Sequence, residues 1–175
     1  MEKGFVQIYT GNGKGKTTAA MGLAVRACGR GLRVVIVQFL KGSSTGEMKV
    51  LEGINGVKLI RVANADKFFW KLTDDEKEQM KRVAEAVLLD IETLFEKNEV
   101  DVLILDEVMG AMKNGIVTMK QIFALLDIRP KQVEVVLSGR DAPKELIDRA
   151  DLVTEMQDVK HYFSKGVKAR EGIEY

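Results

Sequence analysis

Short apolar runs alternate with longer stretches of helical periodicity along most of this chain. A run such as 34–37, which is apolar at every position, is typical of a parallel strand that is buried on both faces of a sheet. Strands that alternate with helices in this way predict an α/β fold with a mostly parallel sheet. The expected strands cover residues 5–9, 34–37, 57–62, 102–105, 133–137 and 152–154.

Several helices carry recognisable start signals. Thr73 with Glu76, and Thr118 with Gln121, have the spacing of a capping box, in which the first residue and the fourth satisfy each other's backbone N–H groups. Pro143 suits the first turn of a helix, where its missing N–H costs nothing. The expected helices cover residues 17–28, 73–95, 118–126 and 143–149.

Two segments lack a periodic pattern. Residues 40–56 are rich in Gly and Ser, and we expect a loop with little regular structure there. Residues 155–175 form a mixed tail. Neither a repeat nor a shift in composition marks a boundary, so we expect a single domain over residues 1–175.

Composition narrows the classes of function. Lys and Arg together number 27 and Asp and Glu 26, giving a net charge of +1, and this balance argues against a nucleic acid as partner. One His and one Cys exclude an intramolecular disulfide and a His/Cys metal cage. Since no apolar run approaches the roughly 20 residues of a membrane span and no signal peptide is present, we expect a cytoplasmic protein without a membrane partner.

A phosphate-binding loop follows the first expected strand. The P-loop pattern is G-x-x-x-x-G-K-[ST], in which backbone N–H groups face phosphates, Lys16 reaches the terminal phosphoryl groups and the Thr17 hydroxyl coordinates Mg²⁺. A surface turn is the alternative, and a dinucleotide fingerprint fits worse because Lys16 occupies its last glycine position. The candidate phosphate ligands are Gly11, Asn12, Gly13, Lys14, Gly15, Lys16, Thr17 and Thr18.

Thr10 stands at the first position of the P-loop pattern, where glycine is usual. A β-branched residue does not readily adopt a positive φ, so we expect the strand to leave its turn differently from the usual loop. The loop still lies between a strand and a helix, as its mechanism requires. Together with the alternating pattern it predicts a single-domain P-loop, RecA-like three-layer fold.

Two adjacent carboxylates, Asp106 and Glu107, end the expected strand at 102–105. A P-loop protein usually needs a carboxylate at the end of a neighbouring strand to hold the metal or its water shell. The alternative is that an acidic pair simply ends a strand. We expect Thr17 and at least one carboxylate of the pair to hold the metal, and the sequence does not distinguish between the two.

Other candidates follow the expected strands. Arg140 is either a phosphate ligand or a solvated charge, and Lys14 is either a phosphate clamp or a charge at the rim. For His161 we expect a structural role rather than catalysis. The aromatic residues 68–70 form either a plug of the core or a wall for a large flat ligand.

Together, these motifs resemble those of a known family, the ATP:corrinoid adenosyltransferases, and the resemblance covers nearly the whole chain. The segments that carry it are residues 9–20, Gln38 to Gly42, Gly46-Glu47, Phe68-x-Trp70, Leu105 to Glu107, Ser138 to Arg140, Val159 to His161, Gly166, Ala169 and Gly172-Ile173.

The resemblance implies a reaction. A cobalt(I) corrinoid attacks the 5′ carbon of ATP, which lies in reversed polarity in the loop, and triphosphate leaves. Because cobalt(I) carries no proton to remove, the enzyme has to position its substrates and stabilise the leaving group. Lys14, Lys16 and Thr17, with Mg²⁺ or Mn²⁺, would supply that stabilisation. The catalytic candidates are Lys16, Thr17 and Glu107.

The resemblance also implies partners. Phe68 and Trp70 would line the corrinoid pocket and help exclude the lower axial ligand, so that cobalt(II) can be reduced. A reduced flavoprotein would supply the electron, and family members are homodimers. The alternatives are a conventional P-loop kinase or NTPase acting at the γ-phosphate and a nucleotide-dependent binding module without turnover.

Overall fold

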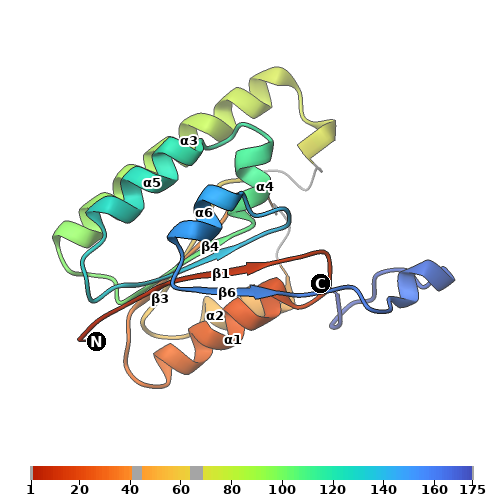
Figure 1. Cartoon of the computed structure of the whole chain (residues 1–175), viewed down its shortest axis with the longest axis horizontal. Helices are drawn as coiled ribbons and strands as arrows, with labels where there is room; N and C mark the ends of the chain where they lie inside the picture. The colour runs from red at the N-terminus through yellow and green to blue at the C-terminus, as the bar shows by residue number, and fades with distance from the viewer. Residues whose placement is uncertain (1, 41–44, 64–68, 175) are drawn as a thin grey trace.

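One parallel sheet of six strands forms the centre of the fold (Figure 1). A computed structural model describes residues 2–40, 45–63 and 69–174, with the exception of the Trp70 side chain. The order of strands across the sheet is β3-β2-β4-β5-β1-β6. The strands are β1 (Val6–Thr10), β2 (Val34–Gln38), β3 (Val57–Arg61), β4 (Val102–Asp106), β5 (Glu134–Ser138) and β6 (Leu152–Glu155).

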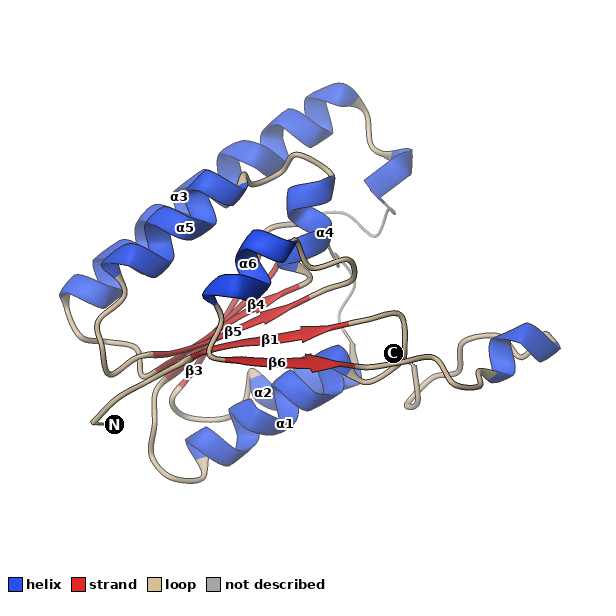
Figure 2. Cartoon of the chain, in the orientation of Figure 1, coloured by secondary structure: helices blue, strands red, loops and turns tan. Residues whose placement is uncertain are grey.

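Helices cover both faces of the sheet and make a three-layer structure (Figure 2). On one face lie α1 (Lys16–Cys28) and α2 (Gly46–Leu51). On the other lie α3 (Asp74–Glu96), α4 (Val108–Lys113), α5 (Met119–Ile128) and α6 (Lys144–Arg149). Two short 3₁₀ helices, η1 (Phe69–Lys71) and η2 (Tyr162–Lys165), complete the described chain. The predicted α/β fold with a mostly parallel sheet is therefore confirmed.

Alternate residues of the strands build the two cores. Leu103 and Leu105 of β4 are fully buried in the core under α3, α4, α5 and α6. Ile104, between them, is fully buried in the core under α1 and α2 with Ala20 and Ala24. Because successive side chains of a strand point to opposite faces, a strand buried on both faces has to be apolar throughout, as the sequence of β4 is.

Both predicted capping boxes are present. The Glu76 amide donates to Thr73 Oγ1 at 3.2 Å and the Thr73 amide donates to a Glu76 carboxylate oxygen at 2.7 Å. Thr118 and Gln121 make the equivalent pair at 3.2 and 2.7 Å. Each box satisfies backbone donors that would otherwise lack an intrahelical acceptor, so these helices begin where the sequence predicts.

The expected loop over residues 40–56 is wrong in part, because α2 forms within it. Its residues Met48 and Leu51 are fully buried against the sheet, in the core that α1 also covers. A helix of six residues is too short to show a clear 3.6-residue period, and it forms because packing stabilises it. The same reason explains α4, which no sequence pattern predicted. In the described part of the chain, no helix is long and apolar enough to cross a membrane.

Candidate active site

The phosphate loop connects β1 to α1 at the carboxyl edge of the sheet. Thr10 remains the last residue of β1, and the positive φ of 96° falls on Gly11 instead. The Thr10 hydroxyl accepts a hydrogen bond from the Ala142 amide at 3.3 Å. The threonine therefore suits an extended backbone position, and its side chain ties the loop after β5 to the end of β1.

Lys16 lies inside the loop. Its side chain is buried, and Nζ donates to the carbonyl oxygens of Gly11 at 2.6 Å and Gly13 at 2.8 Å. An ammonium has three N–H donors, so these two bonds leave one for a ligand. Burial lowers the pKa of Lys16; the Glu107 carboxylate opposes this change and the Arg140 guanidinium adds to it. Phosphate oxygens would relieve that cost, because they replace the lost hydration of the ammonium.

Thr17 meets Asp106 and Ser138 beneath the loop. The Thr17 hydroxyl donates to Asp106 Oδ1 at 3.0 Å, and the Ser138 hydroxyl donates to the same oxygen at 2.6 Å. Ser138 Oγ also accepts from the Glu107 amide at 3.0 Å. Three segments, α1, the end of β4 and the end of β5, thus fix one carboxylate. Ser138 was not among the predicted site residues, although it ends an apolar run and belongs to a segment that carries the family resemblance.

The oxygen atoms at this point fit a hard divalent cation. Asp106 is fully buried, and its Oδ2 has no hydrogen-bond partner in the described structure. An unpaired buried carboxylate oxygen is costly unless a cation or water satisfies it. A hydroxyl and carboxylate oxygens are the donors that Mg²⁺ prefers. Glu107, which follows at the N-terminus of α4 with φ of 60°, lines the cavity that opens from the phosphate loop.

Gln38 of β2 is the neighbour of Asp106 in the sheet. The two residues are paired in the register of β2 and β4, so both side chains lie on the face covered by α1 and α2. The Gln38 amide is fully buried, and neither its oxygen nor its nitrogen has a partner within the described ranges. The sequence placed Gln38 at the end of a strand but gave no sign that its amide would be unpaired.

A cavity of about 710 Å³ opens from the phosphate loop. It brings together the predicted residues Asn12, Lys14, Lys16, Glu107 and Arg140, which come from three separate parts of the sequence. The remaining wall consists of α1, α2 and the C-terminal segment, which comprises residues 156–174. The lining residues include Met21, Gly22, Val25, Gly46, Glu47, Val50, Leu51, His161, Gly172, Ile173 and Glu174.

Two loop residues point toward the C-terminal segment. The Gly13 amide donates to the Met156 carbonyl at 2.7 Å, although the loop pattern predicts an amide that faces phosphate. Lys14 Nζ lies 2.8 Å from Glu174 Oε1, so its ammonium is paired with a carboxylate. Neither Met156 nor Glu174 was a sequence candidate, because they lie about 150 positions from the loop and no short-range pattern connects them.

His161 has a structural contact and also lines the cavity. Its Nδ1 accepts a hydrogen bond from the Phe163 amide at 3.1 Å and so caps η2. The expected structural role is therefore present.

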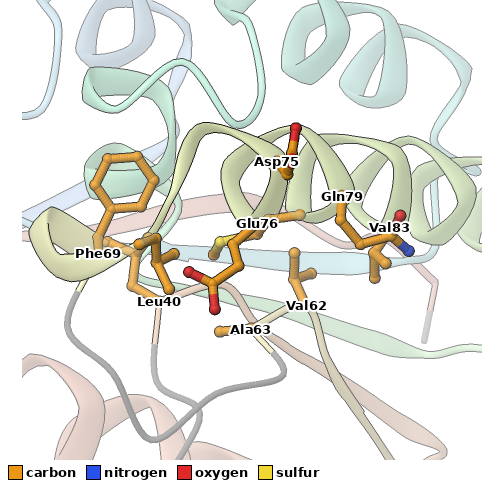
Figure 3. A pocket seen from close by; sticks show the side chains of 10 residues that line it. Leu40, Val62, Ala63, Phe69, Asp75, Glu76, Gln79 and Val83 are labelled. Atoms are coloured by element: carbon orange, nitrogen blue, oxygen red, sulfur yellow. The ribbon is translucent and has the colours of Figure 1, made fainter.

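A second cavity, of about 490 Å³, lies between the N-terminal half of α3 and the ends of β2 and β3 (Figure 3). Its wall is mostly apolar and includes Leu40, Val62 and Phe69, and Glu76 also lines it. Phe69 packs against the core under α3, which agrees with a plug. The predicted corrinoid residue Phe68 lies outside the described residues, as does the side chain of Trp70.

Sequence comparison identifies relatives over the whole chain. The family described as ATP:corrinoid adenosyltransferase BtuR/CobO/CobP matches residues 2–175. A corrinoid adenosyltransferase of Pseudomonas aeruginosa is 37% identical over 175 residues, which cover 99% of this chain and 85% of that protein. A corrinoid adenosyltransferase of Escherichia coli K12 is 35% identical and one of Salmonella typhimurium 36%, each with 99% of this chain and 87% of the relative covered.

Structural comparison supports the fold. The crystal structure of the flagellar accessory protein FlaH from Methanocaldococcus jannaschii superimposes with a TM-score of 0.58. The match covers 89% of this chain and 72% of that one, at 16% sequence identity. Similarity at this level concerns the fold alone.

Proposed function

This chain belongs to the ATP:corrinoid adenosyltransferase family, and we propose that it transfers the 5′-deoxyadenosyl group of ATP to the cobalt(I) of a corrinoid in adenosylcobalamin biosynthesis or salvage. The observation that carries the proposal is the loop itself. In a chain that matches the family from residue 2 to residue 175, Lys16 lies inside the loop and Thr17 is bonded to Asp106 beside it. A kinase or NTPase acting at the γ-phosphate is not favoured by these relatives.

The reaction displaces triphosphate from the 5′ carbon. The cobalt(I) electron pair forms the cobalt–carbon bond while the bond from C5′ to the α-phosphate oxygen breaks and triphosphate takes its electrons. No proton is transferred in this step. The protein's contribution is to hold the two substrates in line and to stabilise the negative charge that develops on the leaving oxygen.

Several groups of this chain would stabilise the leaving triphosphate. Two of the three N–H donors of the Lys16 ammonium bind loop carbonyls, and the third would bind a phosphate oxygen. Lys16, Thr17 and Thr18 form the first turn of α1. Their backbone amides therefore have no intrahelical acceptor, and they lie at the positive, N-terminal end of the helix dipole. Arg140, whose charge acts on Lys16, would hold an outer phosphate with its planar set of donors.

Thr17, Asp106 and Glu107 would hold a divalent cation, Mg²⁺ or Mn²⁺, against the phosphates. The cation would neutralise part of the leaving charge. Ser138 would keep Asp106 oriented, because it donates to Oδ1, while Oδ2 has no partner among the described residues.

The corrinoid, its reductant and the assembly are further parts of the proposal. Phe68 and Trp70 would line the corrinoid pocket and displace the lower axial ligand, which makes cobalt(II) easier to reduce. A reduced flavoprotein would supply the electron, and two copies of the chain would form a homodimer. The support for these three points is the family resemblance.

Product analysis tests the function. The protein would be incubated with ATP, Mg²⁺ and a chemically reduced corrinoid, and the products separated by chromatography. We expect equal amounts of adenosyl-corrinoid and inorganic triphosphate. Recovery of ADP and phosphate without adenosyl-corrinoid would contradict the proposal.

A further inference from the structure

Lys14 uses its ammonium on the C-terminal segment. Nζ lies 2.8 Å from Glu174 Oε1, 3.0 Å from the Ile173 carbonyl oxygen and 3.3 Å from the Tyr162 hydroxyl. A lysine ammonium has three N–H donors, and these contacts occupy all three. In this structure the Lys14 ammonium therefore binds the C-terminal segment and has no N–H donor left for a phosphate.

Glu174 is the centre of this cluster. Its carboxylate also accepts from the Arg170 amide at 2.7 Å, from Arg170 Nε at 3.3 Å and from the Tyr162 hydroxyl. The Arg170 guanidinium lies over the Tyr162 ring, 4.9 Å from its centroid. Hydrogen bonds from Arg170, Lys14 and Tyr162 hold the pKa of Glu174 far below its usual range, so the carboxylate is charged at every physiological pH.

A separate attachment holds the start of the same segment. The Met156 amide donates to the Thr10 carbonyl at 2.8 Å, and the Gly13 amide donates to the Met156 carbonyl at 2.7 Å. A Cβ on Gly13 would lie 2.7 Å from the Gln157 backbone, so the two chains are in close contact. These bonds do not involve Glu174, and a substitution there leaves the segment anchored beside the loop.

The Lys14–Glu174 pair lies in the wall of the nucleotide cavity, together with Lys16 and Arg140. The Lys14 side chain is 42% exposed and that of Glu174 is 16% exposed. Ion pairs this close to solvent are weak and are screened by salt. A polyphosphate, with several charged oxygens, can therefore compete with Glu174 for the Lys14 ammonium.

We propose that Glu174 limits how tightly the loop holds a polyphosphate, by competing for Lys14, and that it limits free triphosphate more than ATP. Free triphosphate has one more ionisable oxygen than the triphosphate of ATP, because its α-phosphate is no longer esterified. An uncommitted lysine at the rim would hold the product more strongly than the substrate. The selectivity part rests on the proposed function, in which triphosphate is the product that must leave.

The variant Glu174→Gln tests the competition, because it keeps the size of the side chain and one acceptor oxygen for Lys14 and removes the charge. The amide nitrogen cannot accept the bonds that Oε2 receives from Arg170, but the attachment through Met156 is untouched. The matched control is Glu171→Gln, an exposed glutamate of the same segment. Dissociation constants for sodium triphosphate and for ATP would be measured by titration calorimetry. We expect Glu174→Gln to tighten triphosphate binding about fivefold and ATP binding less, and the control to change neither.

The double variant Lys14→Met/Glu174→Gln isolates the pair. We expect the gain in triphosphate affinity to vanish in the double variant, because the competed ammonium is gone. Unchanged or weaker triphosphate binding by Glu174→Gln would overturn the competition, and equal tightening of both ligands would overturn the selectivity for product. Wild-type protein that binds triphosphate but forms no adenosyl-corrinoid would contradict the proposed function and the selectivity for product, while the competition at Lys14 would stand.

Discussion

The hydroxyl of Thr17 donates to Asp106 Oδ1 at 3.0 Å, although 89 positions of sequence separate the two residues. The same oxygen accepts from Ser138, while Oδ2 stays buried without a partner in the described part of the chain. Hydrogen bonds to Oδ1 thus orient the carboxylate, and Oδ2 is available to bind a cation. Such preorganisation is what a cation site requires, because the ligand does not have to reorient when the cation binds.

Substitution of Ser138 by Ala should weaken divalent cation binding without loss of the fold. Removal of a group that orients a metal ligand typically costs about 10-fold or more in metal affinity. The measurement is titration of Mn²⁺ in the presence of ATP, with free Mn²⁺ followed by electron paramagnetic resonance. Thr93→Ala is the control, since the Thr93 hydroxyl bonds to the Leu89 carbonyl on an exposed stretch of α3. Equal Mn²⁺ affinity in both variants would contradict the role given to Ser138.

As pH rises, ATP affinity should fall at a lower pH than it would if Lys16 had the pKa of an ordinary lysine. Burial lowers the pKa of Lys16 from 10.5, and only the charged ammonium attracts phosphate. Affinity is therefore full below this lowered pKa and is lost as pH rises through it. ATP raises the pKa again, so binding in that window takes up protons. Calorimetry in buffers of different ionisation enthalpy would detect the uptake, and its absence in Lys16→Arg is the control, because Arg stays charged.

The Thr10→Val variant tests why threonine replaces glycine at the head of the loop. Valine keeps the shape of the side chain but loses the acceptor for the Ala142 amide. We expect the free energy of unfolding to fall by about 1 kcal/mol, as for the loss of one hydrogen bond. Urea denaturation measures the change. Thr10→Ser, which retains the hydroxyl, should lose less, and the reverse order would show that the methyl group matters more.

Trp70→Ala should separate reduction of cobalt from transfer of the adenosyl group. If Trp70 helps exclude the lower axial ligand, its loss affects assays that start from cobalt(II) and largely spares those that start from pre-reduced cobalt(I). Parallel initial rates in the two assays check this. Lys16→Ala is the comparison, because loss of a charge from the phosphate site should reduce both rates alike. Equal losses for Trp70→Ala would remove the proposed role.

Local sequence rules gave much of the fold. The two capping boxes define the starts of α3 and α5, and apolar runs mark all six strands to within one or two residues. The exceptions are short elements. α2 depends on the burial of Met48 and Leu51 against the sheet, which is a tertiary contact and leaves no clear period in six residues.

Some residues of the site were likewise predictable from a local pattern, and others were not. Lys16 and Thr17 follow from the loop pattern, because backbone geometry and chemistry both lie within nine consecutive residues. Ser138 and Glu174 do not, since each matters through a partner far away in the sequence. No local pattern shows that the Gln38 amide is buried without a partner in the described part of the chain.

By itself, the sequence determined a parallel α/β fold, a phosphate loop headed by Thr10 and membership of a corrinoid adenosyltransferase family. The tertiary structure decided which atoms face the ligand. It fixed Asp106 between Thr17 and Ser138, and it turned Lys14 from the phosphates toward Glu174. Periodicity and motifs report interactions between near neighbours in the chain, whereas hydrogen bonds across about 150 positions depend on how the sheet brings the carboxyl ends of its strands together.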